Sequence, residues 1–356
     1  MRVLITGICG FVGSALARAW IEAEMGLTVY GMDNFIRPGS ETNRVPLQKL
    51  GIRLYHGDIR IASDFEALPP VDWVIDAAAN PSVLAGVDGR SSSRQLIEHN
   101  LMGTVNILEY CKHHSAGFIL LSTSRVYSIL PLEKVVVEIA GDAFCLKEGQ
   151  PLPVGLSPAG VSESFSTISP ISLYGSTKLA SEILALEYGE TYGLPVWINR
   201  CGVLAGAGQF GHPDQGIFAY WINAWLRRRP LVYFGFGGKG YQVRDCLHPH
   251  DLIRLLRKQT TPGAVARTRV VNIGGGLNNA VALAELSRWC GDRFGVHAVA
   301  GNPETRRFDI PWLVMDSSLA REVWGWQPQI PLHLILEEIA SHAEQHPEWC
   351  ELSGLP

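Results

Sequence analysis

Tyr174 and Lys178 are the residues whose types and spacing most strongly suggest proton-transfer chemistry. They lie four residues apart at the start of a segment with helical apolar periodicity, so in a helix both side chains occupy one face. A positive charge beside a phenol favours the phenolate and would lower a pKa that is about 10 in an unperturbed tyrosine. The spacing is common by chance, so a catalytic pair also requires a cofactor site and a third catalytic group.

A glycine-rich turn near the N-terminus supplies the candidate cofactor site. Residues 2–6 form a continuously apolar run that predicts a buried strand, and helical periodicity begins at Val12. Between them lie Gly7, Gly10 and Gly13, at a spacing that allows a tight turn, close approach of a pyrophosphate and packing of the helix on the strand. The N-terminus of the helix would then bind the phosphates. The alternative is a flexible turn between two core elements.

Asp33 ends the next predicted strand, 20 residues after Gly13, where a ribose-binding carboxylate is expected. Such a carboxylate accepts hydrogen bonds from ribose hydroxyls and would repel a 2′-phosphate, which favours NAD over NADP. Two alternatives stay open. Arg37 could hold a phosphate, and Asp33 could be a turn-initiating acid before Asn34.

Strands alternate with helices through the first 200 residues, which predicts an α/β fold with a doubly wound parallel sheet, a Rossmann fold. The further strands are expected at residues 52–58, 71–76, 118–121 and 195–200, with a helix at 96–113. Ligands of such sheets bind beyond the carboxyl ends of the strands. The residues that we expect in one crevice are the glycine turn 7–13, Asp33, Ala77, Ala78, Ala79, Ser122, Thr123 and Ser124. The hydroxyl groups among them could instead be helix caps.

We expect two domains. A NAD-binding Rossmann domain covers residues 1–205, and a smaller C-terminal substrate-binding lobe covers 206–356, with segments of about 240–275 returning to the first domain. Residues 128–171 interrupt the first domain with an expected β-hairpin around Gly141-Asp142 and then a loop rich in Pro, Gly and Ser. So long a connection is usually functional, often a lid.

The composition is that of a globular protein with a large core. Of the 356 residues, 47% are hydrophobic and 18% charged, and the net charge of −4 gives no broad basic field, so neither nucleic acid nor a membrane is the expected partner. Seven cysteines without a Cys-x-x-Cys motif indicate reduced thiols in a cytoplasmic protein. The chain begins directly with a strand and has no run of about 18 apolar residues, so we expect neither a signal peptide nor a membrane span.

The run His248-Pro249-His250-Asp251 could be read as a metal cluster. It has no further ligand types nearby, so we expect the end of a strand and a capped helix there, and no metal site.

The chain resembles the extended short-chain dehydrogenases/reductases, specifically their NAD-dependent nucleotide-sugar epimerase and dehydratase family. The resemblance covers nearly the whole length and rests on the three glycines, Asp33-Asn34, Asp58-Ile59, Asn100, Ser122-Thr123, the Tyr174/Lys178 pair and residues 243–248. Within the family, the chain is most similar to the CDP-sugar 2-epimerases, on residues 33–39, 78–82, 209–210, 214–216 and 242–245.

The resemblance implies a role for each matching residue. Tyr174 is the general base, Lys178 its electrostatic partner and ribose ligand, and Thr123 holds the sugar hydroxyl that is oxidised. The implied NAD contacts are Gly7, Gly10, Phe11, Val12, Gly13, Asp33, Asn34, Arg37, Asp58, Ile59, Ala77, Ala78, Ala79, Asn100, Ser122, Tyr174, Lys178, Cys201 and Val203. The implied nucleotide-sugar contacts are Pro81, Ser82, Thr123, Gln209, Phe210, Gln215, Gly216, Arg244 and Arg306, with the two arginines on the diphosphate.

The residues after Thr123 separate the activities within the family. Its dehydratases resemble one another in a Thr-Asp-Glu pattern, whereas here Ser124 and Arg125 follow Thr123, and the 128–171 insertion does not match the relatives closely. We therefore expect an epimerase that transiently oxidises a ring carbinol, at C2 of a CDP-sugar by resemblance. The alternatives are a C4 epimerase of a UDP-sugar, a net NAD(P)-dependent sugar oxidoreductase and a non-catalytic dinucleotide-binding protein. The resemblance also implies a homodimer or homotetramer.

Overall fold

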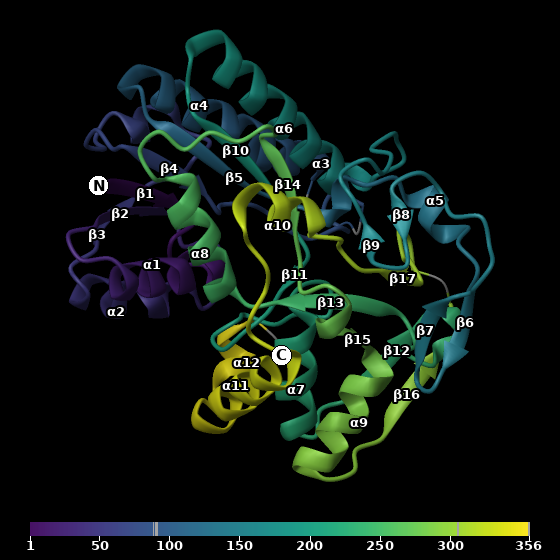
Figure 1. Cartoon of the computed structure of the whole chain (residues 1–356). Helices are drawn as coiled ribbons and strands as arrows, with labels where there is room; N and C mark the ends of the chain where they lie inside the picture. Colours follow the sequence, from purple (N-terminus) through teal and green to yellow (C-terminus); the bar gives the residue numbers. More distant parts are fainter. Residues whose placement is uncertain (88, 90–91, 305, 355–356) are drawn as a thin grey trace.

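The protein is built around a seven-stranded parallel sheet (Figure 1). The structure, a computed structural model, describes residues 1–87, 89, 92–304 and 306–354. The strand order is β14-β10-β5-β4-β1-β2-β3, so the chain begins inside the sheet and proceeds to both edges. The strands are β1 (Arg2–Thr6), β2 (Thr28–Asp33), β3 (Arg53–His56), β4 (Trp73–Asp76), β5 (Gly117–Thr123), β10 (Val196–Cys201) and β14 (Val270–Ile273). This order confirms the predicted doubly wound parallel sheet.

Helices cover both faces of the sheet, which is why its strands are apolar runs. Alternate residues of β1 enter opposite cores: Val3 and Ile5 pack on one face and Leu4 on the other. The helices of the first core are α1 (Phe11–Ala23), α2 (Arg44–Lys49), α8 (Pro249–Gln259) and α10 (Ser318–Trp324). Those of the second are α4 (Gly103–His114) and α6 (Ser172–Tyr192). The helix expected at 96–113 is α4 preceded by α3 (Ser93–Ile97) and a π-helical turn (Glu98–Met102).

The C-terminal part adds a second group of elements below the sheet in Figure 1. Its strands are β11 (Val203–Leu204), β13 (Val243–Leu247), β15 (Ala280–Ala282) and β17 (Trp312–Leu313) in one sheet, and β12 (Leu231–Phe234) with β16 (Val299–Asn302) in another. Its helices are α7 (Ile217–Leu226), α9 (Leu283–Phe294), α11 (Leu332–Gln345) and α12 (Trp349–Leu352). Their core contains the buried Trp221, whose indole donates to Ser287 at 2.9 Å.

Two late segments of the chain lie with the first sheet. β14 pairs with β10 in parallel, and α8 packs on α1. The helix α8 begins after His248, whose Nδ1 accepts from the amide of His250, with Pro249 in the first turn, so this run does cap a helix as expected. Over the described residues, no three His, Cys, Asp or Glu side chains gather in a way that could hold a metal ion.

The 128–171 insertion is anchored on the C-terminal elements. It contains α5 (Ile129–Glu133), the predicted hairpin β6 (Val137–Ala140) and β7 (Ala143–Leu146), and a second small hairpin of β8 (Leu156–Ser157) and β9 (Gly160–Val161). The amide of Phe144 donates to Tyr241, and that of Val161 donates to Val314.

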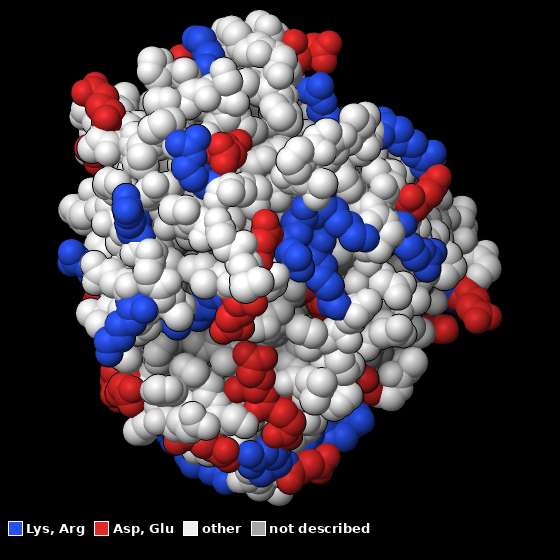
Figure 2. Space-filling view, turned by 60° about the vertical axis from the view of Figure 1, so that its left-hand side comes forward, with Lys and Arg blue, Asp and Glu red and all other residues white. Residues whose placement is uncertain are grey.

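The charged surface is mixed in sign. On the face drawn in Figure 2, Lys and Arg side chains are interspersed with Asp and Glu, so this face carries no broad field of either sign. No helix in the described part of the chain is long and apolar enough to cross a membrane.

Candidate functional site

A cavity of about 1110 Å³ lies at the carboxyl ends of the central strands. Four of those strands reach it in the order of the sheet: Thr123 from β5, Ala77 after β4, the glycine turn after β1 and Asp33 from β2. The opposite wall comes from the C-terminal elements. This is where ligands of doubly wound sheets bind, and it brings together most of the residues that the sequence singled out.

The turn after β1 leaves backbone open to the cavity. Gly7 has φ of +63°, and a Cβ on Gly13 would lie 2.3 Å from the carbonyl oxygen of Gly7, so neither position accepts another residue without a backbone shift. The turn ends at Gly10, and α1 begins at Phe11 with its free amides at the cavity wall. A turn of this geometry, which we call the cradle, fits a pyrophosphate.

Backbone amides hold the side chain of Asp33 in place. Its carboxylate accepts from the amides of Cys9 and Phe35, each at 2.8 Å. Burial raises the pKa of Asp33, and hydrogen bonds from the amides of Phe35, Cys9 and Gly10 oppose that shift. Arg37 donates to Gln215 at 3.0 Å and to the carbonyl of Phe210, so its guanidinium holds the 210–215 loop. The carboxylate beside the cradle fits NAD.

Thr123 and Tyr174 meet at the other end of the cavity. Both line it, and their hydroxyl groups are hydrogen-bonded. The structure corrects one expectation: the pKa of Tyr174 is raised to about 12, because burial outweighs the hydrogen bond from Thr123 and the charge of Arg125. Lys178 lies deeper in α6, where burial lowers its pKa and the buried carboxylate of Asp76 opposes this.

A buried ion pair stands behind these residues. Glu182 lies on α6 one turn beyond Lys178 and forms a bidentate pair with Arg200 of β10, with an Nη2–Oε2 distance of 2.6 Å. Glu182 also accepts from the hydroxyl of Ser122. Ser122 therefore faces α6, and the ion pair joins α6 to the sheet.

Several predicted contacts lie behind the cavity wall. Asn100 accepts from the amide of Asn80 at 2.8 Å and donates to its carbonyl at 3.0 Å, which shapes the loop after β4. Cys201 is buried at the end of β10, in the core that contains α1 and α8. The predicted residues that do not line the cavity are Asp58, Ser82, Asn100, Ser122, Lys178 and Cys201.

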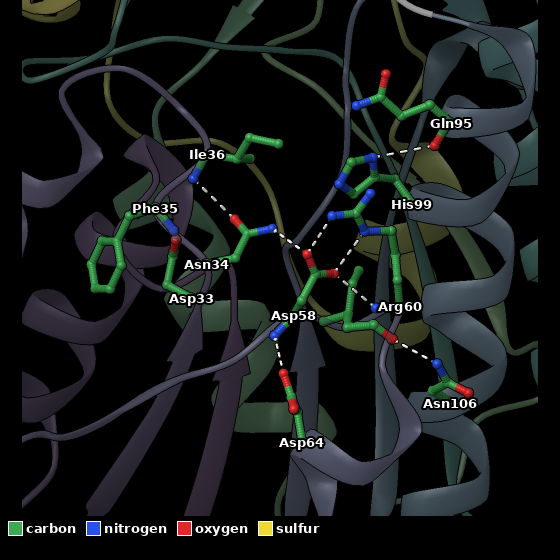
Figure 3. Close-up of polar contacts among 11 residues, drawn as sticks. Asp33, Asn34, Phe35, Ile36, Asp58, Arg60, Asp64, Gln95, His99 and Asn106 are labelled. Atoms are coloured by element: carbon green, nitrogen blue, oxygen red, sulfur yellow. Dashed lines mark hydrogen bonds and ion pairs between the residues drawn. The ribbon is translucent and has the colours of Figure 1, made fainter.

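Asp58 does not line the cavity, and its carboxylate is hydrogen-bonded to Asn34 and Arg60 (Figure 3). The oxygens accept from the Arg60 amide at 2.9 Å, from Arg60 Nε at 2.9 Å and Nη2 at 2.6 Å, and from Asn34 Nδ2 at 3.0 Å. Burial raises the pKa of Asp58, but the bonds and charge of Arg60 outweigh it, so the pKa is lowered. Its neighbour Ile59 does line the cavity.

The C-terminal wall holds the candidate nucleotide-sugar contacts. Arg244 donates to Asp309 at 3.4 Å, and the guanidinium of Arg306 lies 4.0 Å from the centroid of the Phe234 ring. Phe210 is stacked on Trp349 with ring centroids 5.1 Å apart. The predicted substrate residues that line the cavity are Pro81, Thr123, Gln209, Phe210, Gln215, Gly216, Arg244 and Arg306. Among the described lining residues, none comes from the 128–171 insertion.

Sequence reasoning missed residues that the fold brings to the wall. His99, Arg307 and Asp309 line the cavity without belonging to any pattern in the sequence. In the sequence, Arg125 served only to show that no acid follows Thr123. In the structure it lines the cavity beside Tyr174 and donates to the carbonyl of Phe308 at 3.2 Å. Its position directly after Thr123 and Ser124, at the end of a predicted strand, is the sequence feature that could have identified Arg125 as a cavity residue.

Comparison with known proteins gives one consistent result. The chain is 29% identical over 342 residues to the CDP-paratose 2-epimerase of Salmonella typhi, which covers 93% of this chain and 95% of the relative. It is 26% identical over 363 residues to the dTDP-glucose 4,6-dehydratase of Streptomyces niveus, covering 99% and 95%. The crystal structure of UDP-glucuronic acid 4-epimerase from Bacillus cereus, in complex with UDP-glucuronic acid and NAD, superposes with a TM-score of 0.74 at 26% identity, covering 97% and 99%.

The family model described as "NAD dependent epimerase/dehydratase family" matches residues 3–274. That range includes the glycine cradle, Asp33, the Thr123–Tyr174 pair and the edge strand β14. With the cradle and the carboxylate fitting NAD, the chain belongs to the NAD-dependent epimerase/dehydratase family, whose members act on nucleotide-sugars.

Proposed function

We propose that the protein is an NAD-dependent nucleotide-sugar epimerase that oxidises a ring carbinol transiently and returns the hydride to the other face. The preferred centre is C2 of a CDP-sugar. The observation that carries the proposal is that the side chains next to Tyr174 in the cavity wall are those of Thr123 and Arg125.

Tyr174, Thr123 and Arg125 each have a role in the proposed reaction at the sugar. NAD, when bound, supplies the hydride acceptor and donor and a positive charge on its oxidised ring. Tyr174 takes the proton of the ring hydroxyl and gives it back when the carbonyl is reduced. Thr123 orients that hydroxyl through its bond to Tyr174. Arg125 is the nearby positive charge that favours the phenolate against the effect of burial.

The acids of the cavity do not favour dehydration. Eliminating a hydroxyl group needs a general acid close to the reacting carbons. The acids among the described lining residues are Asp33, Asp214 and Asp309. Asp33 accepts from the amides of Cys9 and Phe35, and Asp214 lies 3.7 Å from Nδ1 of His212. Asp309 accepts from Gln242, from Arg244 and from its neighbour's amide. The side chain beside Tyr174 is the cation of Arg125, which has no proton to give at neutral pH.

The C2 position and the CDP group are supported by the similarity to the Salmonella typhi 2-epimerase. A second candidate is C4 epimerisation of a UDP-sugar, which the likeness to the Bacillus cereus 4-epimerase supports.

The test is product analysis with a panel of CDP- and UDP-sugars in D2O. We expect an epimer of unchanged mass, formed without solvent deuterium at the inverted carbon, because the hydride returns from the cofactor. A product lighter by one water would identify a dehydratase, and NADH accumulating in proportion to substrate would identify a net oxidoreductase. The Tyr174→Phe variant is the control and should form the product at least about a hundredfold more slowly.

A further inference from the structure

A buried polar cluster lies between the end of β4 and α6, behind the cavity wall. Asp76, the last residue of β4, is 1% exposed and accepts from the hydroxyl of Thr6 at 2.8 Å. The hydroxyl of Thr104 lies 3.2 Å from the other carboxylate oxygen and 2.9 Å from the backbone carbonyl oxygen of Asn100. The carboxylate is therefore joined to the π-helical turn that carries Asn100.

Asn100 extends this cluster to α6, before and after Lys178. Its side-chain amide donates to Thr177 at 3.2 Å, and its carbonyl oxygen accepts from Ser181 at 3.0 Å. Lys178 follows Thr177 in α6 and is only 2% exposed. Asp76 and Lys178 therefore belong to one buried cluster, as a carboxylate and an ammonium group with almost no access to water.

The other titratable groups around Lys178 do not balance its charge. Glu182, one turn further along α6, is already paired with Arg200. Burial raises the pKa of the Cys201 thiol at the end of β10 to about 12, and it also raises that of Tyr174 to about 12, so both are uncharged at neutral pH. Among the described residues, this leaves the carboxylate at the end of β4 as the counter-charge of Lys178.

Asp76 needs a counter-charge for the same reason. Its hydrogen-bond donors, two hydroxyl groups and the amide of Ala78, are neutral. The nearby thiol of Cys111 in α4 is also uncharged, because burial raises its pKa. Burial raises the pKa of Asp76, and the charge of Lys178 is the largest effect that opposes this. Since an isolated buried charge tends to be neutralised by a change of protonation, each of the two groups keeps the other ionised.

We propose that Asp76 is the buried counter-charge that keeps Lys178 an ammonium ion in the folded enzyme, and that it acts on the reaction through Lys178 as a positioning residue. Asp76 does not line the cavity, so it touches neither cofactor nor substrate. Its effect on turnover rests on the proposed function, whereas its effect on the charge of Lys178 holds for an epimerase and a dehydratase alike.

The decisive variant is Asp76→Asn, which removes the charge and keeps the hydrogen bonds. The amide oxygen can accept from Thr6, and the amide nitrogen can donate to Thr104, whose hydroxyl still donates to the carbonyl of Asn100. Without the carboxylate, Lys178 is a lone buried cation, so its pKa falls further in the folded state but stays at about 10.4 in the unfolded chain. Between those two pKa values the unfolded state binds more protons, so the stability of the variant rises with pH.

Denaturant unfolding of the full-length protein between about pH 6 and about pH 9 measures this effect without any substrate. Asp76→Asn should be less stable than the wild type at the acidic end. The difference should shrink as pH rises, by up to about tenfold in the unfolding equilibrium constant per pH unit, which is the slope of one proton. The double variant Asp76→Asn/Lys178→Met should lose this slope, because no buried cation is left. Asp142→Asn is the matched control, since Asp142 pairs with Arg288 at the surface, and its effect should not depend on pH in this range.

Three results would overturn the proposal. The first is a loss of stability in Asp76→Asn that is the same at both ends of the pH range, as a role in packing alone would give. The second is a slope that persists in the double variant, because a group other than Lys178 would then be titrating. The third is an Asp76→Asn protein that circular dichroism shows to be unfolded and that Lys178→Met does not restore.

Turnover tests the catalytic consequence separately. The ratio of wild-type to Asp76→Asn kcat should grow at least about tenfold across the same pH range, as Lys178 loses its proton in the variant. A ratio that is independent of pH would refute the action of Asp76 on the reaction. If the wild-type protein converts no nucleotide-sugar, the proposed function fails, while the unfolding data still decide whether Asp76 keeps Lys178 charged.

Discussion

Glu182→Gln tests whether its ion pair with Arg200 holds α6 on the sheet. Glu182 is 2% exposed and Arg200 8%, and three hydrogen bonds join them. The substitution leaves the guanidinium of Arg200 buried without its counter-charge, with the hydroxyl of Tyr127 at 3.3 Å as a remaining partner. Breaking a buried pair from one side is destabilising by about 3–5 kcal/mol.

The size of the effect in a melting experiment follows from the chain length. At about 2.1 cal/mol/K of unfolding entropy per residue, 356 residues give roughly 0.75 kcal/mol/K, so the substitution should lower Tm by about 4–7 °C. The exposed pair Arg94–Glu98 is the matched control, with side-chain exposures of 88% and 39%. Glu98→Gln removes the same charge and should change stability by no more than about 0.5 kcal/mol, less than 1 °C.

Calorimetry and denaturant unfolding measure both variants. The single variant Arg200→Met and the double variant Glu182→Gln/Arg200→Met complete the cycle. Because Arg200→Met removes the orphaned charge, the double variant should be no less stable than Glu182→Gln alone. The reasoning fails if Glu182→Gln costs less than about 1 kcal/mol, as an exposed pair would. It also fails if the two single effects simply add.

Three further outcomes are expected. Tyr174→Phe should lower kcat by about a hundredfold or more while NAD binding, read by calorimetry, persists; wild-type turnover would refute its role. Gly13→Ala forces a Cβ to within 2.3 Å of the Gly7 carbonyl oxygen, so NAD affinity should fall at least about tenfold, and an unchanged Kd would contradict the cradle. Burial and then the charge of His346 lower the pKa of His342 to about 4, so the folded state binds fewer protons than the unfolded one between there and about 6.5. The free energy of unfolding should fall as pH drops through that window, and His342→Gln should make Tm depend less on pH there. If Tm changes with pH as steeply in the variant as in the wild type, the role of His342 is refuted.

The sequence predicts the parts of this molecule that depend on neighbours in the chain. The glycine turn, Asp33 and the strand before each of them form one continuous pattern, so their placement in the cavity could be foreseen. The apolar runs of β1 and β5 are buried on both faces for the same reason, which made the parallel sheet predictable.

The parts that could not be predicted depend on distant partners. Asp58 meets Asn34 because β2 and β3 pair in a register that only the fold sets. Arg37 is held by a loop 178 residues away, which no local pattern contains. The raised pKa of Tyr174 follows from burial in the folded protein. The sequence showed only that Lys178 is four residues away, which by itself predicts a lowered pKa.

The edge strand β14 has a consequence for how the protein is made. It pairs with β10, yet Ile273 leaves the ribosome roughly 70 residues after Cys201, on the order of 10 s later at the rates of translation. During that interval the backbone donors and acceptors of β10 on that side are open to any extended segment nearby. During synthesis the sheet edge at β10 is therefore unpaired for a time. In a chain that ends before residue 270 this edge stays unpaired, because β14 is missing. We expect chains truncated between β10 and β14 to aggregate even though all of β10 is present.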